Sequence, residues 1–420
     1  MLYLTTLYCG PAARTGKGRG QEGTGLYPEL AALGFSEGAS PALASLVGRQ
    51  CALLPSYELA RQELASRGTR LGIKVVHRLA RTLGAQVLAT RTRDLLRWRA
   101  GALPPGQELA GKRVAAMIDG GRTRLRRVTR KQRGKGKAKA QKRRYKAEWR
   151  EPKLLIIFEL DERGRMKAGT RPWIDGTFGG PDEAMELLAL HLHRLGAAAA
   201  AVLVFVADGA PWVWERLAWA ERRLGVAAGK IVPVLDWCHA AHNIGLALEA
   251  LGVEEGERRR LFKKLRRWLR RGWCGLVVSE LEGLGEARGW PKALEQPLAY
   301  LIKHMKAGHL RYGEFRRKVL PLGSGAVESA MRRVINLRLK GPGLMWLEGN
   351  AEAALVLRAA AVTGRWEETL ARVREEVGKD RRLAWDWKSP DMVAELRAKI
   401  PIGPPVAQEA AGQQDRGAAA

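Results

Sequence analysis

The sequence has few cysteines and no long apolar segment. Its 420 residues include four cysteines, Cys9, Cys51, Cys238 and Cys274, too few and too scattered for a disulfide framework. The longest apolar run, residues 197–207, is far shorter than the ~20 residues that a membrane-spanning helix needs. The segment MLYLTTLYCG has no basic region and too short an apolar stretch for a signal peptide. We therefore expect a cytoplasmic protein with no membrane partner.

Acidic side chains are also scarce. Asp and Glu total 43 against 73 Lys and Arg, which gives a formal net charge of +30. Such an excess favours a polyanionic partner, and double-stranded DNA is the usual one, so we expect a nucleoid-associated protein. The same excess argues against an enzyme of small acidic metabolites. Hydrophobic residues make up 46% and charged residues 28%, a balance typical of a globular chain.

The length predicts two or three domains, and the hydrophobic period changes along the chain. Residues 1–108 predict a helical N-terminal region, in which the periodic segments 57–66 and 71–83 flank a turn with Gly68. This pattern is compatible with a DNA-binding helix-turn-helix and equally with a small helical bundle that contacts no DNA. Four segments follow: an α/β core in 109–239, an all-helical insertion in 240–320, a second part of the core in 321–377 and a partly disordered tail in 378–420.

Four apolar runs without helical periodicity predict buried strands of an α/β sheet. They are residues 114–118, 154–160, 202–207 and 231–235. Three of the four are followed by or end in an aspartate, Asp119, Asp208 or Asp236. In open α/β sheets, functional groups gather at the carboxyl ends of the strands. If the strands that precede Asp119 and Asp208 are neighbours, their two carboxylates lie side by side.

Neighbouring carboxylates repel one another unless a cation lies between them. In a chain this basic, carboxylates held together predict a hard metal ion with oxygen ligands, such as Mg²⁺. Glu328, one turn into a helix that begins near Ser324, is the best candidate for a third ligand. Structural alternatives remain open: Asp-Gly turns the chain after a strand, and Glu328 pairs with Arg332 four residues later.

Two basic tracts lie in the same part of the chain. Residues 122–150 hold fifteen Lys or Arg and one acidic residue, Glu148. This tract predicts a mobile loop that contacts DNA phosphates, or a solvated run without a partner. Residues 258–271 predict a basic amphipathic helix, which suits DNA better than a membrane surface. The predicted DNA-binding residues are Arg122, Arg124, Arg126, Arg127, Lys135, Lys137, Lys139, Lys142, Arg143, Arg144, Arg266, Arg267, Trp268 and Arg332.

Asp119, Asp208, Asp236-x-x-His239 and Glu328 occur in this order in the segments MIDGG, VFVADGAPWVWE, IVPVLDWCHAAHNI and LPLGSGAVESAMRRVINLRLKGPGLMW. In these segments, over residues 112–366, the chain resembles the DDE transposases of bacterial insertion sequences. It looks most like the Kra-type group, which is related to the Mutator-like transposases. The resemblance implies an RNase H-like mixed-sheet core interrupted by an all-α insertion. It also implies that Asp119, Asp208 and Glu328 are catalytic metal ligands, with Asp236 and His239 in support.

The reaction implied by this resemblance is metal-dependent DNA cleavage at the ends of an insertion sequence, followed by strand transfer into target DNA. The implied cofactors are two Mg²⁺ or Mn²⁺ ions, and the implied assembly is a homo-oligomer on DNA. Two alternatives stay open. One is an RNase H-like nuclease or resolvase that cuts without joining, and the other is an inactive, DNA-binding relic of a transposase.

Overall fold

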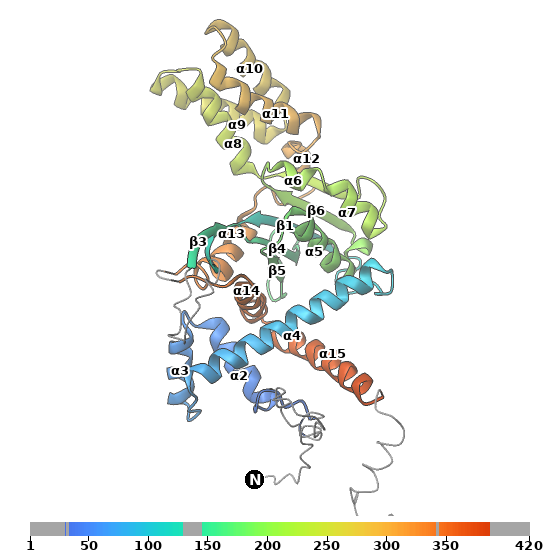
Figure 1. Cartoon of the computed structure of the whole chain (residues 1–420). Coiled ribbons are helices and arrows are strands. Elements are labelled where there is room, and N and C mark those ends of the chain that lie inside the picture. The colour runs from blue at the N-terminus through green and yellow to red at the C-terminus, as the bar shows by residue number, and fades with distance from the viewer. Residues whose placement is uncertain (1–29, 31–32, 129–144, 342–343, 387–420) are drawn as a thin grey trace, which may run out of the picture. The chain divides into compact units, whose positions relative to one another are not determined.

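Figure 1 shows the computed structural model of the chain, an α/β fold with one mixed five-stranded sheet and many helices. The structure describes residue 30 and residues 33–128, 145–341 and 344–386. These residues divide into two compact units, one holding Ser36–Arg372 and the other the described residues outside that range. The boundaries expected at 108, 239 and 320 all fall inside the first unit, and they stay predictions.

The five strands of the main sheet follow the order β5-β4-β1-β6-β7. Their bounds are Arg113–Gly120 (β1), Lys153–Glu159 (β4), Trp173–Thr177 (β5), Val202–Ala207 (β6) and Ile231–Leu235 (β7). The central strand β1 pairs antiparallel with β4 and parallel with β6. Beyond them, β5 pairs antiparallel with β4, and β7 pairs parallel with β6. All four predicted strands are therefore confirmed, and they belong to one sheet.

Helices cover both faces of this sheet, which explains why its strands are almost continuously apolar. β4 is buried along its whole length. On one face, α5 (Pro181–Arg194) shares a core with the strands, where Met185 and Leu188 lie among side chains such as Ile118. On the other face, α13 (Gly325–Met331) and α14 (Glu348–Val362) pack against β1, β4 and β5 (Figure 1).

The sequence does not predict β5. Its segment WIDGT contains Asp175 and Gly176, residue types that strands usually avoid. Asp175 is nevertheless only 6% exposed, because Arg91 and His191 pair with its carboxylate at 3.2 and 2.7 Å. This strand therefore holds a buried charge whose partners come from two helices. The pattern of hydrophobic residues cannot predict a strand of this kind.

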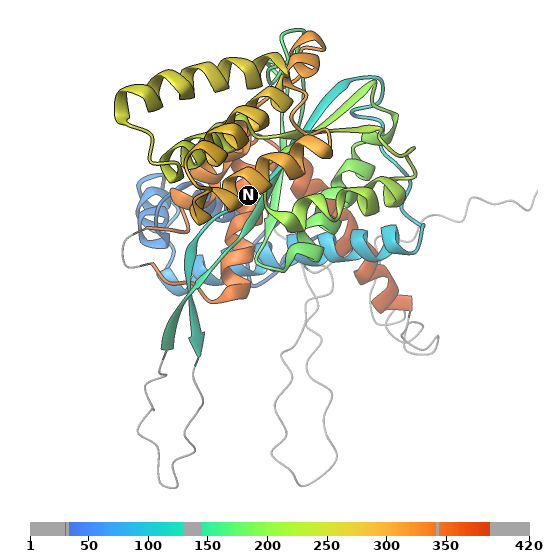
Figure 2. The same ribbon diagram turned by 90° about the horizontal axis from the view of Figure 1, so that it is seen from above.

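The basic tract that predicts a mobile loop instead begins and ends as an antiparallel hairpin. β2 (Thr123–Val128) pairs with β3 (Tyr145–Arg150), and Figure 2 shows this hairpin extending away from the main sheet. Aromatic partners make the charge compatible with strands: the Arg124 guanidinium lies 5.5 Å from the ring centre of Trp149. The prediction of a mobile loop is therefore wrong for both ends of the tract. Its middle, residues 129–144, lies outside the described residues.

Within residues 33–112, three helices precede the sheet. They are α2 (Pro41–Leu53), α3 (Tyr57–Ser66) and α4 (Ile73–Arg99). Ser40 and Ser56 begin the first two, each hydroxyl accepting a backbone N–H from the first turn. Val47, Leu64 and Leu79 belong to the core that these helices share. Both predicted helices are confirmed, the second running well past its expected end, and a helix-turn-helix role stays a prediction.

Residues 240–320 contain only helices, turns and loops, as predicted. The helix bounds here are Trp237–Ala250 (α8), Glu255–Arg271 (α9), Cys274–Ala287 (α10), Lys292–Leu294 (η2), Glu295–Lys306 (α11) and Tyr312–Arg317 (α12). α9 has the predicted basic amphipathic character, because Leu265 and Leu269 are buried whereas Arg266 and Arg267 are exposed. Figure 1 shows α8–α11 packed together as a bundle. None of the described helices has the length and apolar character needed to cross a membrane.

Two helical segments are interrupted. Residues 211–224 form α6 (Pro211–Trp214) and α7 (Leu217–Leu224), and the helix predicted from residue 324 is α13 followed by a π-helical segment, Arg332–Asn336. Beyond it lie α14 and α15 (Trp366–Asp386). The disorder expected for residues 401–420 concerns a segment outside the described part of the chain.

Candidate active site

Two carboxylates lie side by side at one end of the sheet. Asp119 is near the end of β1, and Asp208 directly follows β6. The parallel register pairs Ile118 with Ala207, so the two aspartates occupy the next matched position. Both side chains are half-buried, and Asp208 Oδ1 accepts a hydrogen bond of 3.1 Å from the backbone N–H of Ala210. The expectation that these two strands are neighbours is therefore confirmed.

Asp236 ties the end of β7 to α8 and to the segment before α13. It is 1% exposed, and its side chain caps α8. Oδ1 accepts the backbone N–H of His239 at 2.9 Å and lies 3.0 Å from Nδ1 of the same residue. Oδ2 accepts the backbone N–H of Ser324 at 2.6 Å and its hydroxyl at 2.9 Å. Burial raises the pKa of Asp236, but these hydrogen bonds outweigh burial and hold the pKa at about 2.

Glu328 reaches the same region from α13. Its side chain is exposed, and its Oε1 lies 2.9 Å from the hydroxyl oxygen of Ser324. That oxygen is also 2.9 Å from Asp236 Oδ2, and a hydroxyl has one proton to donate, so Ser324 serves one carboxylate at a time. Among the described residues, Glu328 and Arg332 form no ion pair. The structural alternative for Glu328, a surface pair with Arg332, therefore does not hold here.

The charged groups in this region act on one another. Burial raises the pKa of Asp119 and a backbone hydrogen bond lowers it, while the negative charges of Asp208 and Glu328 raise it further. The pKa of His239 is raised, chiefly by its hydrogen bond to Asp236 and also by the charges of Asp208 and Asp119. The structure therefore brings the charges of Asp208 and Glu328 within electrostatic reach of Asp119.

The residue types of this site suit a metal ion, whereas the positions of their side chains do not form a metal site. Three carboxylates offer oxygen ligands only, which suit hard cations such as Mg²⁺ and Mn²⁺. In the part of the chain that the structure describes, however, no three His, Cys, Asp or Glu side chains are grouped so that they could hold an ion. Asp119 and Asp208 are placed by their strands, whereas Glu328 is exposed. A site with all three carboxylates as ligands would therefore need these side chains to come closer together.

The helical segment 240–320 contributes an aromatic side chain that the sequence does not single out. Tyr300 of α11 covers the turn after Asp208, so that a Cβ atom on Gly209 would overlap its ring. Burial, and then the carboxylates of Asp208 and Asp236, raise the pKa of the Tyr300 hydroxyl. An aromatic residue on an amphipathic helix is typical of an ordinary core position, so the sequence gives no signal for this contact. The sequence also does not predict the hydrogen bonds of Ser324, although this residue lies in the GSGAVES segment with Glu328.

The predicted DNA-binding residues lie on three separate elements. The Arg266 guanidinium of α9 lies 5.9 Å from the ring centre of Trp237, the residue after Asp236, so α9 approaches the acids. Trp268 is half-buried, with the Lys264 ammonium 4.5 Å from its ring centre. Exposed among the described residues are Arg122, Arg124, Arg127, Arg266, Arg267 and Arg332, and Arg126 is half-buried. Outside the described residues are Lys135, Lys137, Lys139, Lys142, Arg143 and Arg144.

Comparison with known proteins gives no relative from which a function could be carried over. No family model, no curated protein and no solved structure matches the chain. The interpretation of the site rests on its geometry and chemistry and on the motif order in the sequence.

Proposed function

We propose that this protein is a DDE-type DNA transposase that binds insertion-sequence ends and catalyses strand cleavage and strand transfer. The observation that carries the proposal is the parallel pairing of β1 with β6, which sets Asp119 beside Asp208, with the Glu328 charge also acting on Asp119. The negative charges of Asp208 and Glu328 raise the pKa of Asp119, and carboxylates brought together in this way favour a bound cation. The net charge of +30 supports DNA as the partner.

We infer an RNase H-like fold for the sheet. Its strand order, with antiparallel neighbours on one side of β1 and parallel neighbours on the other, supports this inference. The helical segment between Asp208 and Glu328 supports it too, because the family that the sequence resembles has an all-α insertion at this point. The sheet then supplies two fixed carboxylates, and the chain after the insertion supplies the third.

In the proposed site, Asp119, Asp208 and Glu328 would hold two Mg²⁺ or Mn²⁺ ions. When bound, such ions stabilise the attacking and leaving oxygens of an in-line displacement at phosphorus. Asp236 holds Ser324 through the backbone N–H of Ser324, and Ser324 positions Glu328 when its hydroxyl donates to Glu328 Oε1. His239, whose pKa is raised, gains a proton more readily than an ordinary histidine and attracts the phosphate beside the scissile bond.

The proposed reaction has two steps on DNA. Water first attacks the phosphodiester at the element end and releases a 3′-hydroxyl, which then attacks a phosphodiester of target DNA. Exposed arginines on the hairpin, on α9 and after α13 contact duplex phosphates, which position the DNA without reading its sequence. The protein is proposed to act as a homo-oligomer on DNA within the nucleoid.

Asp208→Asn tests the proposal. It should lower cleavage of element-end DNA in Mg²⁺ by about a hundredfold or more, while DNA affinity stays the same or rises because one negative charge near the phosphates is removed. The matched control is Asp182→Asn, which alters an aspartate that is 82% exposed and paired with Arg216 at the start of α5. Cleavage by Asp208→Asn at the wild-type rate would refute the assignment.

A second assay separates a transposase from a nuclease or resolvase. Pre-cut element ends with a free 3′-hydroxyl are supplied with target DNA, and joined products are measured. Strand transfer by the wild type and its loss in Asp208→Asn support the transposase. Cleavage without joining would support the nuclease, and DNA binding without either activity would support an inactive relic.

A further inference from the structure

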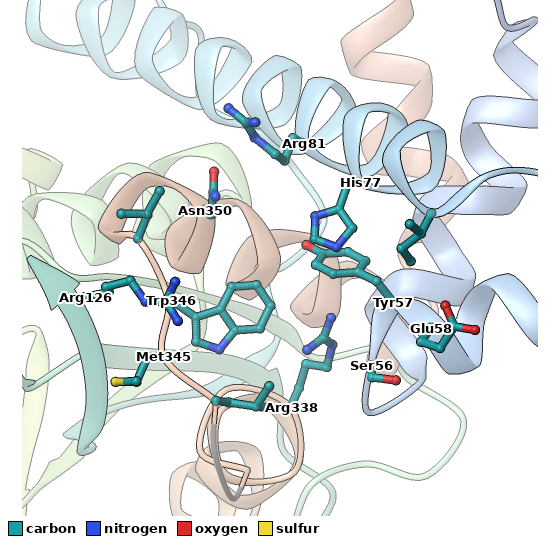
Figure 3. A pocket seen from close by; sticks show the side chains of 13 residues that line it. Ser56, Tyr57, Glu58, His77, Arg81, Arg126, Arg338, Met345, Trp346 and Asn350 are labelled. Carbon is teal, nitrogen blue, oxygen red and sulfur yellow. The ribbon is translucent and has the colours of Figure 1, made fainter. Parts of the chain in front are cut away.

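A pocket that shares no residue with the carboxylate site lies between the N-terminal helices and the basic hairpin. Its volume is about 450 Å³, and α3, α4, β2 and the segment 344–350 form its walls. Figure 3 shows its side chains grouped around Trp346. The lining residues include Tyr57, His77, Arg81, Arg126, Arg338 and Trp346.

Three hydrogen-bond donors of this pocket lack a partner among the described residues. They are Arg338 Nη2, Trp346 Nε1 and Arg126 Nε, and each of these atoms is buried. Arg338 is 1% exposed and Trp346 is 7% exposed. Because buried polar atoms in native proteins are nearly always hydrogen-bonded, three unpartnered donors in one pocket indicate a ligand rich in acceptors.

The arginine at the base of the pocket is held in place by the backbone. Arg338 Nε donates to the carbonyl of Cys51 at 3.1 Å, and Nη1 lies 3.2 Å from the carbonyl of Pro55. The guanidinium is therefore fixed, and it lies over the rings of Tyr57 and Trp346, 5.1 and 4.8 Å from their centres, with Nη2 buried and without a hydrogen-bond partner among the described residues. Glu58 is the one acidic residue among those that line the pocket, and its carboxylate is engaged by Arg61 at 2.6 Å. The pocket is thus positively charged, which favours an anionic ligand.

Aromatic rings form another part of the wall. The Tyr57 ring lies 4.1 Å from that of His77 and 6.1 Å from that of Trp346, measured between ring centres. Burial and the neighbouring charges of Arg81 and Arg338 lower the pKa of His77, so its ring is neutral at pH 7. A ligand that satisfies both the donors and these rings combines an anion with a flat, largely apolar ring.

We propose that this pocket binds one nucleotide, with its phosphate against the arginines and the Trp346 N–H and its base against the aromatic rings. The volume lies within the range of ordinary small-molecule sites. Both a free nucleotide and an unpaired nucleotide of a DNA strand have this chemistry. The hairpin favours the strand, since β2 carries Arg126 into the pocket and presents Arg124 and Arg127 to solvent. That choice of source rests on the proposed function, whereas the chemistry of the pocket does not.

The test compares Trp346→Phe with Trp173→Phe in the full chain. The first change keeps the ring and removes the unpartnered N–H, and the second removes an equally unpartnered N–H from an indole that does not line the pocket. Binding is measured by fluorescence anisotropy without divalent ions, so that cleavage plays no part. The probes are a short duplex with one unpaired thymidine and the same duplex fully paired, with thymidine 5′-monophosphate as competitor.

Trp346→Phe should weaken binding of the unpaired-nucleotide duplex about tenfold, the loss expected for one hydrogen bond to a charged group, and leave the paired duplex unchanged. Trp173→Phe should change neither. If Trp346→Phe weakens only the competition by thymidine 5′-monophosphate, the pocket is a nucleotide site and its ligand is a free nucleotide. If Trp346→Phe binds all three probes as tightly as the wild type does, or loses affinity equally for both duplexes, the proposal is overturned. These outcomes do not depend on whether Asp208→Asn cleaves.

A second pair of variants keeps the test independent of the tryptophan. Arg81→Gln removes an exposed cation from the pocket lining, and Lys74→Gln removes an exposed cation from the same helix outside the pocket. Arg81→Gln should weaken the unpaired-nucleotide duplex more than Lys74→Gln does. Equal losses would show a general charge effect and would refute the site.

Discussion

Replacing Asp236 with Asn should loosen the connection between the sheet and α13. The pKa of the Asp236 carboxyl is held at about 2 against an ordinary 3.8, because its hydrogen bonds outweigh its burial. At about 1.4 kcal/mol for each pH unit, this difference corresponds to roughly 2–3 kcal/mol of unfolding free energy. Little of it is screened by solvent, since Asp236 is 1% exposed. Asp236→Asn should therefore lower the stability measured by urea denaturation by roughly 2–3 kcal/mol.

The difference between wild type and Asp236→Asn should depend on pH in a defined direction. The folded pKa of Asp236 is lowered, so its contribution is complete above the unfolded value of 3.8 and is lost as the pH falls toward 2. The folded pKa of His239 is raised, so its contribution is complete below 6.5 and is lost as the pH rises through the folded value. The difference in unfolding free energy should therefore be largest at about pH 5.

The direct assay is a histidine titration followed by NMR. In the wild type His239 should titrate above the ordinary 6.5, and Asp236→Asn should lower its pKa because the hydrogen-bonded carboxylate is lost. Asp161→Asn is the control, since the Asp161 carboxylate accepts only backbone N–H groups within its own turn. If His239 titrates identically in wild type and Asp236→Asn, and their stabilities agree at every pH, the proposed link between β7, α8 and α13 is wrong.

Two further predictions concern the hairpin and the insertion. Replacing Arg122, Arg124 and Arg127 with Ala should flatten the slope of log DNA affinity against log salt by as much as about 2.7, at about 0.9 for each phosphate contact. The loss should be equal on element-end and random DNA, and an unchanged slope in a salt titration would show that these arginines are merely solvated. Gly209→Ala should destabilise the protein by about 1–3 kcal/mol, because the new Cβ overlaps the Tyr300 ring. Gly275→Ala in α10, where a Cβ meets open space, should be neutral or slightly stabilising in the same denaturation assay, and equal effects of the two changes would contradict the contact.

The sequence predicts the sheet and the position of its acids because both follow from simple patterns. The strands before Asp119 and Asp208 are apolar along their length, since helices cover both faces, and this pattern marks buried parallel strands. An aspartate that follows such a strand must then lie at its carboxyl end. The pairing of these two strands with each other does not follow from the sequence, because no local pattern determines which strands pair.

The parts that the sequence does not predict depend on partners distant in the chain. Asp175 is buried in β5 because Arg91 and His191 pair with it from α4 and α5. Ser324 acquires its role from Asp236, 88 residues earlier. The hairpin escapes prediction for a different reason. Its arginines resemble a solvated run in the sequence, whereas their contacts with Trp149 and Tyr145 become visible only once the strands pair.

The helices of residues 240–320 contact the turns in which Asp208 and Asp236 lie. Tyr300 of α11 lies against Gly209 in the turn that follows Asp208. Tyr312 of α12 donates a hydrogen bond of 2.9 Å from its hydroxyl to the carbonyl of Leu235, the residue before Asp236. The helices of residues 240–320 therefore contact the ends of both β6 and β7, the strands that precede Asp208 and Asp236. Since α9 packs against α12, DNA bound to the exposed arginines of α9, as proposed, would be connected through these helices to the strand ends that carry the two acids.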